Sequence, residues 1–121
     1  MSKIMLAEDD VTMLSLLRTL LRIEGFETVT LSEQENIKDA LVREKPDVVM
    51  MDVHLTQGNG VDFMRDIRSD LGLQEVYVIM QSGMDLQREC TAAGANYFLL
   101  KPYMPDTLIK AIKNGITPGK A

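Results

Sequence analysis

The sequence predicts an α/β fold, a doubly wound five-stranded parallel sheet with five helices on its two faces. Short apolar runs alternate five times with segments whose apolar residues recur at helical spacing. Polar residues directly follow several of these runs, at the edge where the carboxyl ends of parallel strands meet. Successive strand–helix units of this kind are joined by right-handed crossovers. The length of 121 residues suits one domain of ordinary size.

The apolar runs predict five strands, at residues 3–7, 27–31, 48–51, 76–80 and 97–100. The helical spacing of apolar residues predicts five helices, at about residues 11–23, 32–44, 61–70, 85–94 and 106–114. The run at 48–51 is continuously apolar, as expected for a strand that is covered on both faces.

Helix boundaries follow from capping and breaking residues. Gly25 closes the first helix, and Ser32 with Glu35 three residues later forms a capping-box pattern that would open the second. Pro46 ends that second helix. Residues 56–60, TQGNG, read as a loop before the third helix.

The fourth helix is expected to open at Asp85 and to stop near Gly94, because a helix often ends at a glycine. The fifth helix would bury Leu108, Ile109 and Ile112.

Composition excludes several classes of function. The apolar share is 45%, yet no apolar run approaches the roughly 18 residues of a membrane span. The N-terminal apolar stretch is too short for a signal peptide, so a cytoplasmic location is expected. A net charge of −5 argues against nucleic-acid binding by this segment. The single cysteine, Cys90, excludes an internal disulfide and is expected to pack against the core.

Polar residues follow four of the five predicted strands, and they are Glu8, Asp9, Asp10, Asp52, Ser82 and Lys101. Carboxylates that converge in one cleft repel each other unless a cation is present. Oxygen ligands without histidine or cysteine side chains favour Mg²⁺ or Mn²⁺, and a small ion held by carboxylates and water usually serves phosphate chemistry. Taken singly these residues are weak signals, but their joint placement predicts phosphoryl transfer.

Each polar group has an expected part in that chemistry. Asp52 would attack phosphorus, Lys101 would supply positive charge, and the Ser82 hydroxyl would donate to a phosphoryl oxygen.

Four motifs carry a resemblance to a known family, and they are IMLAEDD, VVMMD, VIMQSG and GANYFLLKPY. From Lys3 to about Asn114 the chain resembles the receiver domain of bacterial two-component response regulators, the CheY-like family. The resemblance implies a flavodoxin-like strand order 2-1-3-4-5, a receiver domain over 1–115, and a tail or linker start at 116–121. It also implies that Asp52 accepts a phosphoryl group from a sensor histidine kinase or phosphotransfer protein.

The family pattern implies further roles. Glu8, Asp9, Asp52 and the backbone carbonyl of His54 would hold Mg²⁺, and Asp10 would cap the first helix. Ser82 and Phe98 match the hydroxyl and the aromatic residue that move together on phosphorylation. The Lys101–Pro102 bond is expected to be cis, and the face of the fourth and fifth strand–helix units would contact a downstream protein, a fused output domain or a second copy.

Three positions depart from the family pattern. Thr56 stands where proline is usual, Gly83 replaces a common alanine, and Phe98 lacks the hydroxyl of a tyrosine. A loop with Thr56 and two glycines is expected to be less rigid than average.

Alternative functions stay open at this point. A haloacid-dehalogenase-like phosphatase needs a second aspartate two residues after the nucleophile, where this chain has His54. A flavin mononucleotide carrier is disfavoured because AEDD would repel the phosphate. A receiver-like interaction module that signals without phosphate is the main alternative. The favoured interpretation is a signalling switch that catalyses its own phosphorylation and slow dephosphorylation, not an enzyme that turns over other substrates.

Overall fold

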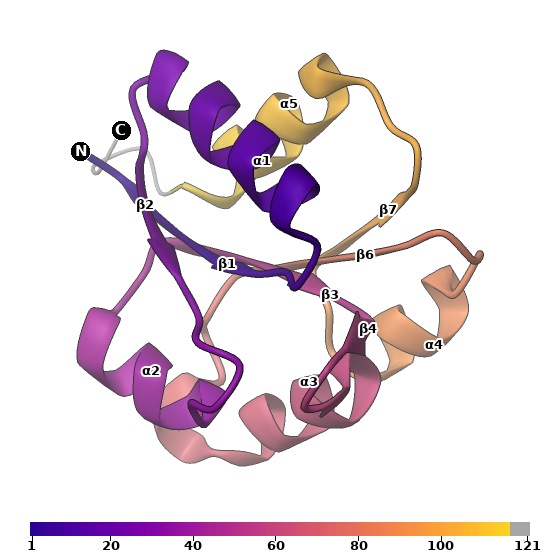
Figure 1. Ribbon diagram of the computed structural model, residues 1–121. Helices are drawn as coiled ribbons and strands as arrows, with labels where there is room; N and C mark the ends of the chain where they lie inside the picture. Colours follow the sequence, from indigo (N-terminus) through magenta and orange to yellow (C-terminus); the bar gives the residue numbers. More distant parts are fainter. Residues whose placement is uncertain (117–121) are drawn as a thin grey trace.

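The structure, a computed structural model, describes residues 1–116 and contains a five-stranded parallel sheet between two layers of helices (Figure 1). The sheet has the order β2-β1-β3-β6-β7, which confirms the predicted order 2-1-3-4-5. Its strands are β1 (Lys3–Ala7), β2 (Glu27–Thr30), β3 (Val48–Asp52), β6 (Val78–Ser82) and β7 (Tyr97–Leu100).

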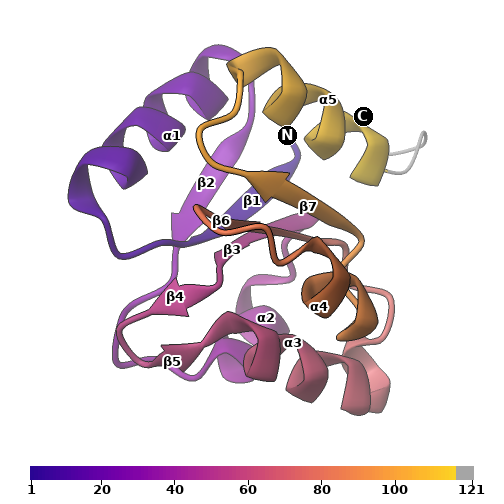
Figure 2. The same ribbon diagram turned by 90° about the vertical axis from the view of Figure 1, so that its right-hand side faces the viewer.

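The two layers of helices are unequal. The helices are α1 (Val11–Ile23), α2 (Ile37–Glu44), α3 (Gly60–Ser69), α4 (Gln87–Ala92) and α5 (Pro105–Gly115). Helices α1 and α5 cover one face of the sheet, and α2, α3 and α4 cover the other (Figure 2). Within residues 1–116, no helix has both the length and the apolar character that a membrane crossing requires.

Strand side chains alternate between the two faces, as the period of two requires. In β3, Val48 and Met50 pack in the core beside α1 and α5, whereas Val49 and Met51 pack in the core beside α2, α3 and α4. All five residues of β3 are buried. The face toward which a side chain at the end of a strand points is therefore set by the alternation along that strand.

The predicted start of the second helix is wrong. The helix begins at Ile37, because Asn36 caps it: Asn36 Oδ1 accepts hydrogen bonds from the amides of Lys38 at 2.9 Å and Asp39 at 3.2 Å. The segment from Ser32 instead forms a turn in which Glu35 N donates to Ser32 O at 3.1 Å. The helix is thus capped by Asn36, which accepts from two amides, and not by Ser32.

Two other boundaries shift by about two residues. Strand β6 begins at Val78, not at residue 76, and α4 begins at Gln87. Asp85 lies just before α4, where its Oδ1 accepts from Gln87 N at 3.3 Å. The glycine stop is confirmed, since Gly94 has a φ of 111° just after the helix.

The predicted loop at 56–60 contains part of a small antiparallel hairpin that the sequence did not predict. Strand β4 (His54–Leu55) pairs with β5 (Gly58–Asn59), and Asn59 then caps α3 by accepting from Val61 N at 2.8 Å. The hairpin lies beyond the end of β3 and beside α3 (Figure 2). It therefore frames one side of the sheet edge where polar residues gather.

Cys90 is fully buried on α4, as expected from the sequence. Burial, with a smaller effect of the Glu89 charge, raises the pKa of its thiol to about 11. The thiol is therefore protonated at neutral pH, and we assign it no chemistry.

Arg68, near the end of α3, binds the two segments that come just before β6 and β7, at the amino edge of the sheet. Its guanidinium donates to the carbonyls of Gly94 at 2.9 Å, Leu73 at 3.3 Å and Gln74 at 3.2 Å. It also donates to Asn96 Oδ1 at 2.8 Å. Arginine suits this place because its planar group offers five donors in a fixed geometry.

Replacing this guanidinium is expected to destabilise the fold. Arg68→Met should lower the free energy of unfolding by about 2–3 kcal/mol, because several carbonyls lose charged donors. Urea denaturation measures the change. The matched control is Arg65→Met, whose exposed pair with Asp62 should contribute less than about 1 kcal/mol. Equal losses in the two variants would contradict the role of Arg68.

Candidate functional site

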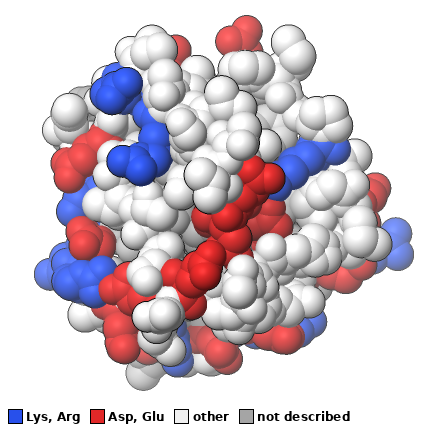
Figure 3. Space-filling view, viewed as in Figure 1, with Lys and Arg blue, Asp and Glu red and all other residues white. Residues whose placement is uncertain are grey.

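Acidic side chains gather over the connection from β1 to α1, at the carboxyl edge of the sheet (Figure 3). Ala7 of β1 is in register with Met51 of β3, so the next residues, Glu8 and Asp52, come to the same level of neighbouring strands. Because side chains alternate between the two faces along a strand, both acids point to the face of the sheet that α1 and α5 cover. Two acids are thus brought together by strand register alone.

Asp52 is the last residue of β3 and is only 5% exposed. One carboxylate oxygen, Oδ1, accepts a hydrogen bond from the His54 amide at 2.7 Å. The other, Oδ2, accepts from the Lys101 amino group at 2.5 Å. Both oxygens of this nearly buried acid are therefore held in defined directions.

Lys101 is the cation of the site. Its Nζ lies 2.5 Å from Asp52 Oδ2 and 3.2 Å from Glu8 Oε1, so it bridges two buried carboxylates. Burial acts to lower the pKa of Lys101, but the hydrogen bond and charge of Asp52, together with Glu8, outweigh burial and raise it. The Lys101 amide donates to Ser82 O at 2.8 Å, and the Lys101–Pro102 bond is cis, as expected.

Each of the three acids after β1 accepts a hydrogen bond from a backbone amide. Glu8 is buried, and its Oε2 accepts from the Asp10 amide at 3.1 Å. Asp10 caps α1 through a bond from Met13 N at 2.9 Å, which confirms its predicted role. Asp9 Oδ2 accepts from the Thr56 amide. A proline at position 56 could not make this bond, because proline has no N–H.

The three carboxylates expected to bind a metal have a suitable donor chemistry. Glu8, Asp9 and Asp52 offer only oxygen atoms, which Mg²⁺ prefers. In the described part of the chain, their side chains do not form a group of three arranged around one ion. The Lys101 amino group lies between Glu8 and Asp52, and Asp9 faces the Thr56 amide.

The predicted switch residues fall on the opposite face of the sheet. Ser82 ends β6 and is fully buried, and its Oγ accepts from Met84 N at 3.0 Å. Phe98 is half-buried and packs against the core that α2, α3 and α4 share with the sheet. It is in register with Met80 of β6. Ser82 and Phe98 therefore lie on one face, away from Glu8.

Comparison with known proteins agrees with this geometry. The family model for the response regulator receiver domain matches residues 4–113. The chain belongs to this family.

This receiver domain also resembles individual proteins. The transcriptional regulatory protein YxdJ of Bacillus subtilis strain 168 is 31% identical over 116 residues, which cover 96% of this chain and 51% of YxdJ. The chain thus spans about half the length of that relative. A response regulator receiver domain protein from Clostridium thermocellum has a TM-score of 0.83 at 28% identity, covering 96% of this chain and 94% of that one.

A third similarity concerns the fold. The receiver domain of sensor histidine kinase PA1611 from Pseudomonas aeruginosa PAO1 has a TM-score of 0.80 at 24% identity, covering 93% of this chain and 95% of that one. That structure has a magnesium ion coordinated in its active site cleft. The similarity to that structure concerns the fold, and the family itself is shown by the family model over residues 4–113.

Two residues of this receiver domain join the site without having been predicted. Gln81, which is fully buried in β6, donates through Nε2 to Glu8 Oε1 at 3.5 Å. Tyr103 donates its hydroxyl to Gln81 Oε1 at 2.5 Å. Burial raises the pKa of Tyr103, and the charges of Glu8 and Asp52 add to the effect. The sequence signal that could have indicated Gln81 is a polar amide within the otherwise apolar strand VIMQS.

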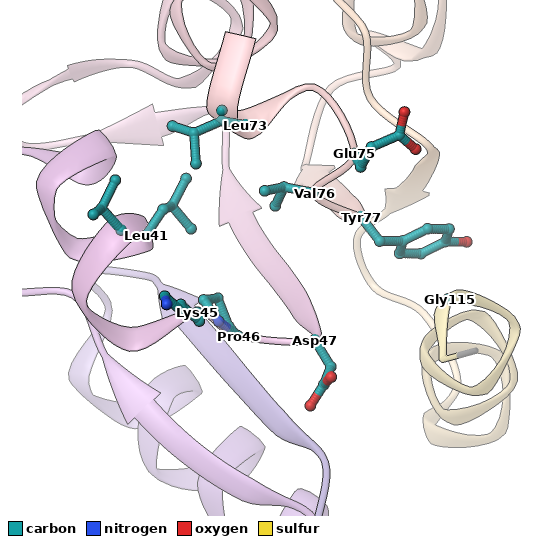
Figure 4. Close-up of a pocket in the computed structure, with 11 residues that line it drawn as sticks. Leu41, Lys45, Pro46, Asp47, Leu73, Glu75, Val76, Tyr77 and Gly115 are labelled. Atoms are coloured by element: carbon teal, nitrogen blue, oxygen red, sulfur yellow. The ribbon is translucent and has the colours of Figure 1, made fainter. Parts of the chain in front are cut away.

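The largest cavity of those described lies elsewhere in the receiver domain. It has a volume of about 570 Å³ and is lined by Leu41, Leu73, Val76 and Tyr77, among others (Figure 4). The lining also includes Pro46 and Asp47, which come just before β3, while Val76 and Tyr77 come just before β6, at the amino edge of the sheet. The cavity is therefore at the opposite edge from Asp52.

The backbone of Asp52 leaves no room for a side chain at the start of α3. A Cβ atom on Gly60 would lie 2.6 Å from the Asp52 carbonyl oxygen and 3.0 Å from Val53 Cα. Gly60 N also donates to Val53 O at 2.7 Å, so the two segments are tied at this point. Glycine is required here for close approach.

We expect Gly60→Ala to lower the free energy of unfolding by about 1–3 kcal/mol, because the methyl group would displace the backbone of Asp52. The matched control is Gly83→Ala beside Ser82, where a Cβ meets nothing within 4 Å. That change should leave stability unchanged or raise it by about 0.5 kcal/mol. Thermal and urea unfolding compare the two, and similar values for both alanines would refute the requirement.

Proposed function

We propose that this receiver domain is a phosphorylation-dependent switch in which Asp52 accepts a phosphoryl group from a sensor histidine kinase or a phosphotransfer protein. The observation that supports this most is the setting of Asp52. Its carboxylate is nearly buried, is oriented by the His54 amide and the Lys101 amino group, and lies beside Glu8. An oriented carboxylate with a neighbouring cation suits nucleophilic attack on phosphorus.

The transfer forms one bond and breaks one. An oxygen of Asp52 bonds to phosphorus while the phosphorus–nitrogen bond of the donor's phosphohistidine breaks, and the leaving imidazole keeps the electron pair. Lys101, now paired with Asp52, would pair with the phosphoryl oxygens and offset their added charge.

Mg²⁺, or Mn²⁺ in its place, would be held by Glu8, Asp9, Asp52 and the backbone carbonyl of His54. When bound, the ion supplies positive charge for the phosphoryl oxygens. The all-oxygen donor set supports this assignment, as does the magnesium ion in the cleft of the similar PA1611 receiver domain.

The signal would leave through the face of β6–α4 and β7–α5. Ser82 and Phe98 share one side of neighbouring strands, so a shift of the Ser82 hydroxyl toward the phosphoryl group would alter the packing around Phe98. A downstream protein, a fused output domain or a second copy would contact this face. The length of YxdJ, about twice the matched region, supports a fused output domain.

We propose that the receiver domain comprises residues 1–115. We also propose that it acts in the cytoplasm and does not itself contact nucleic acid. The tail expected at 116–121 lies, apart from Ile116, outside the described residues.

Incubation with phosphoramidate or acetyl phosphate and Mg²⁺, followed by intact-mass measurement, tests the proposal. We expect the mass of one phosphoryl group to be added to the wild type and to the control Asp62→Asn, whose carboxylate is exposed on α3. Asp52→Asn should stay unmodified. A wild type without an adduct would instead support the module that signals without phosphate.

A further inference from the structure

A chain of hydrogen bonds runs from Tyr103, just before α5, to Glu8. The Tyr103 hydroxyl donates to Gln81 Oε1 at 2.5 Å, and Gln81 Nε2 donates to Glu8 Oε1 at 3.5 Å. Lys101 Nζ donates to the same Glu8 oxygen at 3.2 Å. Glu8 Oε2 accepts from the Asp10 amide. Glu8 is therefore held by three donors from three separate segments.

The direction of the Gln81 amide is set by the groups at its two ends. An ionised Glu8 carboxylate only accepts hydrogen bonds, so it requires the NH₂ end of the amide. The amide oxygen then faces Tyr103, whose hydroxyl is the group that donates to it. Without that hydroxyl, the amide could turn and bring its oxygen toward the Glu8 carboxylate, where the two would repel.

Packing alone does not account for a glutamine at this position. Gln81 is fully buried in a strand whose preceding residues are Val78, Ile79 and Met80. A leucine of similar size would fill the same space without the cost of burying an amide. The alternation of β6 also turns Gln81 toward the face where Glu8 and Asp52 lie, and Asp52 is its register partner in β3.

We propose that Tyr103, acting through Gln81, is a positioning residue that holds Glu8 in place for Mg²⁺ and phosphoryl chemistry at Asp52. The inference rests on the proposed function and adds two residues to it. It also links both ends of the segment from Lys101 to Tyr103 to Glu8, because Lys101 donates to Glu8 directly and Tyr103 acts through Gln81.

The test compares two tyrosine variants that each lose only a hydroxyl group. Tyr103→Phe keeps the buried ring and removes the donor to Gln81, whereas Tyr77→Phe makes the same change at the opposite edge of the sheet. Calorimetric titration with Mg²⁺ gives the dissociation constant, and phosphoramidate gives the rate of phosphorylation. We expect Tyr103→Phe to weaken Mg²⁺ binding about tenfold, as is usual for residues that support a metal ligand. Tyr77→Phe should match the wild type.

A double-mutant cycle separates action through Gln81 from a general effect on the fold. In a Gln81→Leu background, Tyr103→Phe should change Mg²⁺ affinity no further, because its route to Glu8 is already gone. Additive losses in the cycle, or equal affinities for Tyr103→Phe and Tyr77→Phe, would overturn the inference while wild-type phosphorylation stands. A wild type that binds no Mg²⁺ and takes no phosphoryl group would overturn the proposed function itself.

Discussion

The interaction on which the site depends is the contact of the Lys101 amino group with two buried carboxylates. Glu8 is 7% exposed and Asp52 is 5% exposed, and strand register places them side by side. Two acids buried so close together would repel each other strongly without a cation. Lys101 provides that cation from the end of β7, two strands away from β3, so the sheet must form correctly for this contact to exist.

The period of two along each strand separates the site into two functional sides. Glu8, Asp52, Gln81 and Lys101 meet on the side of α1 and α5. Ser82 is the next residue after Gln81, so it points to the other side, where Phe98 packs in the core of α2, α3 and α4. In the proposed switch, charge would change on one side of the strand ends, and packing would respond on the other.

Sequence reasoning was strongest where one physical rule dominated. Apolar runs located the strands, and polar residues after them located Asp52 and Lys101 in the site. It was weaker where two rules competed, as when the Asn36 cap replaced the predicted start at Ser32. The family pattern marked Thr56 as a missing proline, but only the structure shows its amide on Asp9.

Contacts made across the sheet were beyond prediction from one sequence. Gln81 reaches Glu8 from 73 positions away along the chain, and the crowding of Gly60 against Asp52 depends on how α3 is docked. The sequence marks Gln81 as an amide in an apolar strand, but it does not name the partner of Gln81 or of Gly60. Each contact arises from the register of the strands and the path of a loop, which only the folded chain fixes.

The central claim is that Asp52 accepts phosphorus at a site organised by Lys101 and neighbouring acids. A crystal structure with Mg²⁺ and beryllofluoride, which stands in for a phosphoryl group, tests it most directly. We expect beryllofluoride on an Asp52 oxygen, a fluorine within hydrogen-bond distance of Lys101 Nζ, and Mg²⁺ held by Glu8, Asp9, Asp52 and the backbone carbonyl of His54. Beryllofluoride attached elsewhere, or an Asp52 carboxylate that carries none and keeps its present contact with Lys101, would contradict the account.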